Sequence, residues 1–247
     1  MTARPEWLER AAHEAARAPE DFFMRGRPRG TGRRHSAVLV LVGPGGEGPE
    51  TRGSDEGASD TGRSATHEPG AETVVLTERT SALRSHAGQV AFPGGAIDPE
   101  DDGPVHAAIR EATEEVGLDP TGRDDLDVLG TFPPVFVPAS DSSVTPVLAW
   151  WPTPRPLAIT SPAEVDRILT VPLSVLADPR HRFTVTHPDG RRGPGFEVEE
   201  AFVWGFTAHV LDRLLVLGGL ARPWDDGVTR LLPPRVSGGR PPTKEPR

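Results

Sequence analysis

Three glutamates lie close together near the middle of the chain, at a spacing that suits a divalent cation. Glu114 and Glu115 follow Glu111 by three and four positions, so on a helix all three fall within an arc of about 100°. Like charges at this spacing disfavour an isolated helix by about 0.2–0.5 kcal/mol per pair, and a bound cation reverses that effect. Because carboxylate oxygens are the ligands that hard metals prefer, the spacing indicates a Mg²⁺ or Mn²⁺ site.

The residues around the glutamates predict a short helix that presents them on one side. Pro104 suits the first helical position, and Gly117 suits the residue just past the end. Ahead of Pro104, Asp101, Asp102 and Gly103 offer helix-capping chemistry. Clustered glutamates alone are also typical of a solvated acidic helix face. The glycine turn ahead of the helix and the arginine beside Glu111 favour a built site instead. An apolar stripe at helical spacing predicts the buried face: Val105, Ala108, Ile109, Ala112 and Val116.

This pattern resembles the box of the Nudix hydrolase family, which reads G-x5-E-x7-R-E-U-x-E-E-x-G-U with U apolar. Gly95 matches the leading glycine, and the run from Arg110 to Leu118 matches the closing half. Two features depart from the box: Asp101 stands where the family usually has glutamate, and one extra residue separates Gly95 from Arg110. The shorter Asp101 keeps its charge and can pair with Arg110 if the turn shifts to suit it. The resemblance implies an α/β fold in which a mixed β-sheet is sandwiched between helices, and metal-dependent diphosphatase activity.

The sequence ahead of the box resembles one branch of that family, the coenzyme A diphosphatases. The branch signature runs L-L-T-x-R-[S/A]-x3-R-x3-G-x3-F-P-G-G. Its counterpart here is Val75-Leu76-Thr77-Glu78-Arg79, then Arg84, Gly88 and Phe92-Pro93-Gly94-Gly95. The resemblance implies hydrolysis of coenzyme A or its thioesters to 3′,5′-ADP and (acyl-)4′-phosphopantetheine. The alternatives are another nucleoside diphosphate conjugate, such as NADH, ADP-ribose or a nucleotide sugar, or a ligand-sensing domain without catalysis. The intact glutamate set disfavours the last.

The resemblance also suggests a role for each residue. Glu111, Glu114 and Glu115 are the expected metal ligands, with the Gly95 carbonyl as a further oxygen. Arg110 is expected to orient the carboxylates, and Glu111 or Glu114 to act as the base. Glu164, in a later loop, is a further candidate for the base, although a plain surface glutamate is an equal alternative. Arg79 and Arg84 are the candidates for holding substrate phosphates, because a guanidinium binds phosphate bidentately; surface salt bridging is the alternative.

The composition is consistent with a soluble cytoplasmic enzyme, and the resemblance implies a small-molecule substrate. The net charge of −9 argues against a protein that coats nucleic acid. The chain has no cysteine, which excludes disulfides and thiolate metal sites. It also lacks an apolar run approaching the ~20 residues of a membrane span and the apolar core of a signal peptide.

The chain is predicted to hold one catalytic domain at residues 34–225, preceded by a helix and linker (1–33) and followed by a disordered tail (226–247). Residues 43–71 lack large apolar side chains and are expected to form a disordered insertion between two paired strands. Hydrophobic patterns predict helices over residues 5–17, 162–169 and 204–217, and a short helix or turn over 172–177. They predict strands over 36–42, 72–78, 126–130, 143–151, 183–185 and 197–202.

Overall fold

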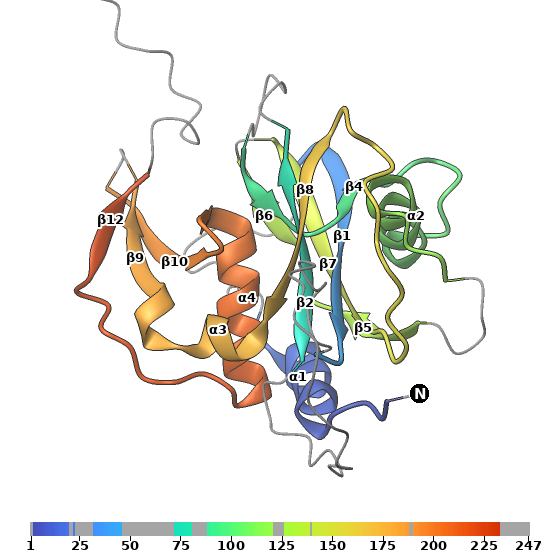
Figure 1. The fold of residues 1–247 in the computed structure, drawn as a ribbon. Coiled ribbons are helices and arrows are strands. Elements are labelled where there is room, and N and C mark those ends of the chain that lie inside the picture. The colour runs from blue at the N-terminus through green and yellow to red at the C-terminus, as the bar shows by residue number, and fades with distance from the viewer. Residues whose placement is uncertain are drawn as a thin grey trace, which may run out of the picture.

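The computed structural model describes residues 2–19, 22, 32–45, 72–80, 88–120, 126–138, 140–187 and 190–232. Most of the expected insertion at 43–71 and most of the expected tail at 226–247 lie outside these residues. The expected disorder of the tail is wrong for Thr229–Leu231, which form a strand paired with residues 184–186. A central sheet separates α2 from α1, α3 and α4, and a small second sheet lies beyond α4 (Figure 1). The layers match the α/β/α architecture that the sequence predicts.

The central sheet is mixed. Its spine is β1 (Arg34–Gly43), which runs parallel to β7 (Ser142–Trp150). On the other side of β1, β2 (Thr73–Arg79) is antiparallel and in turn pairs with β3 (Val90–Ala91) and β8 (Val165–Pro172). The short strand β4 (Gly94–Ala96) pairs with the first half of β1, while β5 (Asp127–Thr131) and β6 (Val135–Val137) pair with β7.

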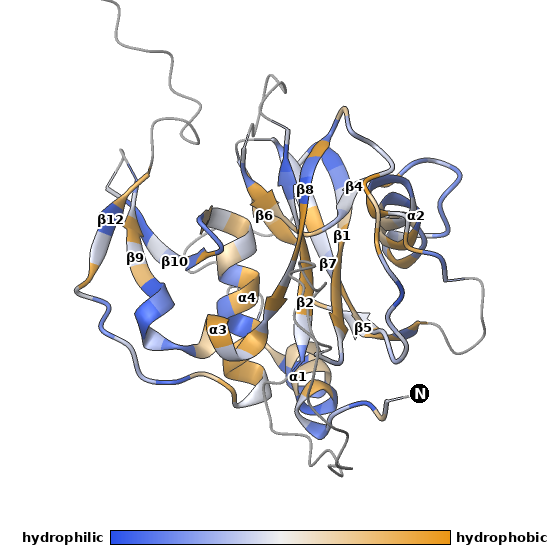
Figure 2. Cartoon of the chain, in the orientation of Figure 1, coloured by the Kyte–Doolittle hydropathy of each residue, from blue (hydrophilic) through white to orange (hydrophobic). Residues whose placement is uncertain are grey.

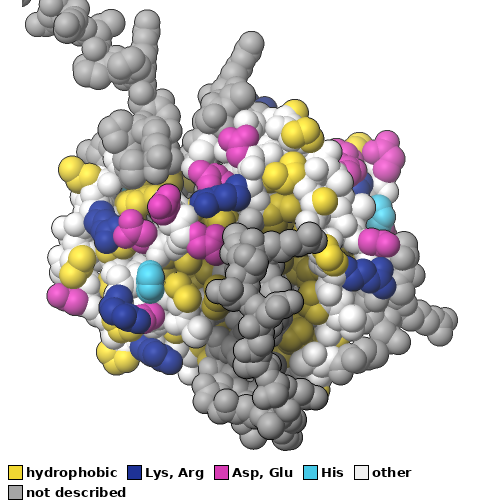
Figure 3. Space-filling model, viewed as in Figure 1, with side chains coloured by type: hydrophobic (Ala, Val, Ile, Leu, Met, Phe, Trp, Pro, Cys, Tyr) yellow, Lys and Arg dark blue, Asp and Glu magenta, His cyan; other side chains and the backbone are white. Residues whose placement is uncertain are grey.

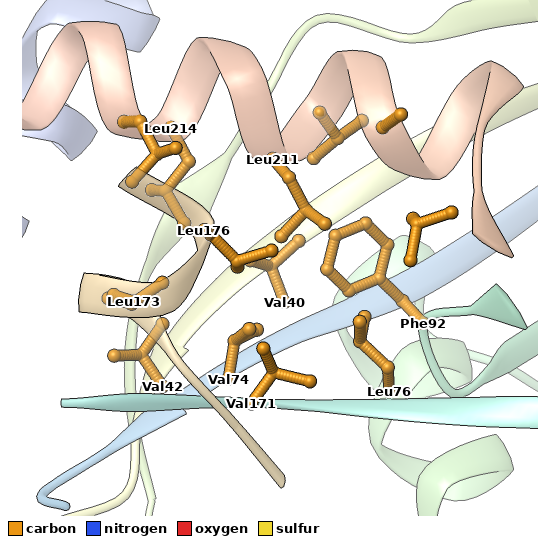
Figure 4. Packing of buried hydrophobic residues seen from close by; sticks show 14 of the residues in the cluster. Val40, Val42, Val74, Leu76, Phe92, Val171, Leu173, Leu176, Leu211 and Leu214 are labelled. Carbon is orange, nitrogen blue, oxygen red and sulfur yellow. The ribbon is translucent and has the colours of Figure 1, made fainter. Parts of the chain in front are cut away.

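Alternate residues of β1 point to two separate hydrophobic cores, because side chains alternate between the faces of a strand. Leu39 and Leu41 belong to the core under α2 (Pro104–Val116). Val40 and Val42 belong to the opposite core, where they meet Leu211 of α4 (Gly205–Gly218) (Figure 4). Both faces of β1 are buried, which explains its nearly continuous apolar sequence. Figure 2 shows the same hydrophobic colouring on the strands of the central sheet and on α4.

The remaining elements pack around α4. Helix α1 (Glu6–Arg17) buries Trp7 and Leu8 against it, and α3 (Leu173–Ala177) follows β8 directly. The second sheet has the order β11 (Ala201–Val203), β10 (Arg192–Val198), β9 (Arg182–Thr186), β12 (Thr229–Leu231), and the 3-10 helix η1 (Pro179–His181) precedes β9. In the described part of the chain, no helix has the length and hydrophobicity needed to cross a membrane.

Most predicted elements are confirmed within a residue or two, but the helix expected over 162–169 is wrong. That segment holds a turn and then β8, which pairs with β2 along its whole length. Val165 and Leu169 have helical spacing, but both also lie on the buried face of a strand. The open edge of β2 decides the outcome, because tertiary pairing overrides a weak local preference. The single strand expected over 197–202 is also wrong: a turn at Glu199 and Glu200 divides it into the end of one strand and the start of the next, which form a hairpin.

Candidate active site

Helix α2 carries the glutamates and is bounded by glycines. Gly103 precedes it with φ 84°, Pro104 is its first residue, and Gly117 ends it in the left-handed conformation. The expected side-chain cap is absent, which corrects the sequence prediction. Asp101 instead accepts a hydrogen bond from the Asp98 N–H (2.8 Å) and turns toward the helix side. The left-handed ending relies on glycine, which adopts positive φ without steric cost.

Gly94 and Gly95 allow the backbone of β4 to touch both its neighbours. A Cβ on Gly95 would lie 2.5 Å from the Glu111 carboxylate carbon. A Cβ on Gly94, which has φ 155°, would lie 2.4 Å from the Ala37 carbonyl oxygen of β1. The Gly94 N–H donates a 3.1 Å hydrogen bond to the Glu115 carboxylate. These two glycines therefore bring a bare stretch of backbone against two of the three glutamates.

Glu111 is half-buried and Glu115 is buried, whereas Glu114 is exposed. Their side chains are 15% and 3% exposed, against 57% for Glu114. Burial raises the pKa of Glu115 to about 7; the charges of Glu111 and Glu164 raise it further, and the Gly94 N–H and Arg79 oppose them. Burial also raises the pKa of Glu111, against the attraction of Arg110. Two carboxylates that are largely shielded from solvent thus lie close together, with Arg110 at 3.0 Å from Glu111 and Arg79 at 3.9 Å from Glu115.

Arg110 connects this pair to the turn ahead of the helix. Its Nε and Nη2 donate to the Asp101 carboxylate at 3.0 and 2.9 Å, and Nη2 also donates to the Ala96 carbonyl at 3.0 Å. Its Nη1 lies 3.0 Å from Glu111 and 3.3 Å from Glu114. The guanidinium therefore holds the pKa of Asp101 well below its usual range. The expected pairing is present despite the shorter acidic side chain.

Arg79 lies at the opposite, buried end of the acidic cluster. Its Nη1 is 3.9 Å from Glu115 Oε1, and its side chain is 27% exposed. Arg79 ends β2 at a register shift, beyond which the Thr80 N–H donates to the Glu164 carbonyl at 2.8 Å. Both Arg79 and Glu164, which are remote in sequence from α2, thus come to its glutamates. Arg84, the other predicted phosphate ligand, falls outside the described residues.

The donors at this site suit a divalent cation. Glu111 and Glu115 offer hard oxygens next to the Gly95 backbone, and Glu114 is accessible from solvent. Across the described ranges, the carboxylates and histidines do not gather around one point as a group of three could around a metal. Arg110 holds Glu114 outward, and Gly94 holds Glu115 inward, which accounts for the separation. On the face shown in Figure 3, acidic, basic and histidine side chains gather near the position of α2.

The fold and this glutamate helix are those of a known class, and comparison with known proteins identifies it. The chain belongs to the NUDIX domain family, whose model matches residues 65–192. It is a Nudix hydrolase, a diphosphatase acting on nucleoside diphosphate derivatives, and enzymes of this family generally need divalent cations.

Two relatives are bacterial proteins described as "Uncharacterized Nudix hydrolase NudL". Those of Citrobacter koseri and Escherichia coli K12 are each 39% identical to this chain over 154 residues, covering 60% of it and 76% of the relative. Among solved structures, the Nudix hydrolase RenU of M. Smegmatis is 20% identical and covers 78% of this chain and 91% of its own, with a TM-score of 0.46.

Proposed function

We propose that this Nudix hydrolase cleaves the diphosphate bond of coenzyme A or its thioesters. The products are 3′,5′-ADP and 4′-phosphopantetheine or its acyl form. The observation that carries the proposal is Arg79, a signature residue whose guanidinium lies beside the buried Glu115 while remaining partly exposed. A cation in that position can contact an anionic substrate while the glutamates hold a metal. Coenzyme A, with a 3′-phosphate besides its diphosphate, has an additional anionic group for an arginine to bind.

In this proposal Glu111, Glu114, Glu115 and the Gly95 carbonyl hold Mg²⁺ or Mn²⁺. When bound, the cation supplies positive charge against the diphosphate and makes a water molecule more acidic. The water oxygen bonds to one phosphorus, the bond from that phosphorus to the bridging oxygen breaks, and Glu111 or Glu114 accepts the water proton. Arg110 holds Glu111 in place from its clamp on Asp101. Glu164, whose charge acts on both buried glutamates, is the other candidate for the base.

Product analysis tests the substrate. Purified protein is incubated with coenzyme A, dephospho-coenzyme A, NADH or ADP-ribose, with Mg²⁺, Mn²⁺ or EDTA, and the products are separated by chromatography. The expected result is 3′,5′-ADP from coenzyme A, formed only with a divalent cation, at a higher kcat/KM than for the other substrates. A preference for NADH or ADP-ribose over coenzyme A would overturn the coenzyme A assignment while leaving Nudix chemistry intact.

Arginine variants test how the substrate is recognised. If Arg79 or Arg84 binds the 3′-phosphate, its replacement by alanine lowers kcat/KM for coenzyme A by about ten- to a hundredfold and spares dephospho-coenzyme A. Arg180→Ala is the matched control, because this side chain is 84% exposed and pairs only locally with Asp178. An equal loss on both substrates would assign the arginine to the diphosphate or to structural support.

A further inference from the structure

Residues 158–164, here called the strap, donate hydrogen bonds to the carbonyls at the C-terminal end of the glutamate helix. The last carbonyls of a helix have no partner within it and must find one elsewhere. In α2, the N–H groups of Gly117 and Leu118 donate hydrogen bonds to the carbonyls of Thr113 and Ala112, respectively. The following three carbonyls accept hydrogen bonds from the strap, and they include those of Glu114 and Glu115.

Thr160 makes two of these three bonds. Its hydroxyl donates to the Glu114 carbonyl at 2.6 Å, and its N–H donates to the Glu115 carbonyl at 3.1 Å. The Ala158 N–H completes the set with a 3.1 Å bond to the Val116 carbonyl. Gly117 leaves room for this contact, since a Cβ there would lie 3.3 Å from the Thr160 methyl. One threonine thus fixes the backbone of both glutamates at the end of α2.

The strap then continues to the arginine side of the site. The Ser161 carbonyl accepts bonds from the N–H groups of Glu164 and Val165, both 3.0 Å, which turns the chain into β8. The Glu164 carbonyl accepts from the Thr80 N–H, next to Arg79. A continuous set of backbone bonds therefore joins the helix end that carries Glu115 to the strand end that carries Arg79.

We propose that Thr160 is a positioning residue of the hydrolase: through the strap it sets the last turn of α2, and so the placement of Glu114 and Glu115 relative to Arg79. This inference rests on the proposed function, in which these glutamates hold the metal. The last turn of a helix frays readily, and a site displaced by about 1 Å loses much of its activity. The hydroxyl of Thr160 restrains the turn at the residue before the buried glutamate.

The test uses variants that change one atom group at a time. Thr160→Val has nearly the shape of threonine but lacks the hydroxyl, whereas Thr160→Ser keeps the hydroxyl and loses the methyl group. Thr160→Ala is measured in parallel in case valine impairs folding. Thr153→Val, at an exposed position on the same connection between β7 and β8, is the matched control. Each variant is checked by circular dichroism, then assayed for kcat and KM with coenzyme A and for Mn²⁺ binding by titration without substrate.

We expect Thr160→Val and Thr160→Ala to lower kcat about three- to tenfold and to weaken Mn²⁺ binding by a similar factor, with KM within about twofold of wild type. Thr160→Ser and Thr153→Val should match wild type in both measurements. A merely structural hydroxyl would lower the melting temperature and leave kcat and Mn²⁺ binding of the folded protein unchanged. That result, or a serine variant as impaired as valine, would overturn the proposal.

The same measurements on Glu115→Gln distinguish a failure of the Thr160 proposal from a failure of the proposed metal site. If Glu115→Gln binds Mn²⁺ and turns over like wild type, the proposed metal site fails, whatever Thr160 does. If Glu115→Gln abolishes both and Thr160→Val changes neither, the metal site stands and only the positioning role fails.

Discussion

Two pairs of charged side chains, both largely shielded from solvent, differ in the signs of their charges. Arg182 and Asp212, between the second sheet and α4, have opposite signs and form a direct ion pair. The Arg182 guanidinium also lies over the rings of Phe196 and Trp224, at 5.0 and 4.7 Å from their centroids. Burial lowers the pKa of Arg182, and Asp212 acts in the opposite direction. The charge there is compensated within the chain.

Glu111 and Glu115, between α2 and β4, have the same sign. Arg110 contacts Glu111 but also Glu114, Asp101 and the Ala96 carbonyl, and Arg79 reaches Glu115 only at 3.9 Å. Burying like charges is costly unless something neutralises them. The first pair is compensated by its opposite charges, whereas for the second pair we propose a divalent cation as the further positive charge.

Neutralising a buried glutamate should remove activity and spare the fold. Glu111→Gln and Glu115→Gln keep size and helix propensity but lose the charge, so we expect turnover to fall by at least about a hundredfold. The melting temperature should stay the same or rise, because an uncompensated buried charge is gone. Glu14→Gln, on the exposed side of α1, is the control. Turnover within about tenfold of wild type, or ~1.4 kcal/mol in the barrier, would contradict the assignment.

Breaking the Arg182–Asp212 ion pair should lower stability and leave the activity of the folded protein unchanged. Arg182→Met leaves Asp212 with only the more distant Arg213, at 3.8 Å, and is expected to lower the free energy of unfolding by up to about 3–5 kcal/mol, measured by urea denaturation. The kcat of the folded variant should remain that of wild type. The double variant Arg182→Met with Asp212→Leu should regain most of the loss, because two apolar side chains can replace a buried ion pair. A large drop in kcat for either variant would mean that this region also supports the site.

His209 of α4, near Asp212, is expected to make the stability of the region around Arg182 and Asp212 depend on pH. Burial lowers the pKa of His209, with Arg213 and His187 adding to the effect; its hydrogen bond to the Gly205 carbonyl and the charge of Asp212 oppose it. Since the unfolded state takes up the proton first, stability is complete above about pH 6.5 and is lost as the pH falls toward the folded-state pKa. We expect a slope of up to about 1.4 kcal/mol per pH unit in urea denaturation between pH 6.5 and 5.5. His209→Asn should flatten that slope, and an unchanged slope would assign it to other groups.

The smallest effect is expected at the connection between β1 and β2. Gly43 pairs with Thr73, and Val42 with Val74, so the two strands are adjacent where the connection begins and ends. Replacing the residues between Pro44 and Glu72 with a short glycine-containing turn should leave stability and turnover nearly unchanged, because loop length costs only ~0.6 kcal/mol per doubling. Thermal melting and kcat of the shortened protein check this. A large loss of turnover would instead make the connection a lid or a partner site.

Sequence reasoning gave the glutamate helix almost to the residue because its signals are local. Pro104 and Gly117 mark its ends, and the spacing of its glutamates puts them on one side. The same reasoning failed at β8, where Val165 and Leu169 fit a helix as well as a strand until β2 is present to pair with. The sequence also predicted a capping role near Asp101, but the Asp101 side chain instead pairs with Arg110, nine residues later.

The sequence alone determined the family, the glutamates and the two glycines, because fixed spacing within one turn and one helix dictates which side chains meet. It did not determine which glutamates are shielded from solvent, nor that Thr160 donates hydrogen bonds to the last carbonyls of the glutamate helix. Those features depend on chain segments that are distant in sequence and are brought together only when the sheet forms. The burial that raises the pKa of Glu115 comes from packing α2 on β1 and β4, and the segment that carries Thr160 leads into β8, which pairs with β2. Local pattern carries no record of such contacts, so only the tertiary structure could decide them.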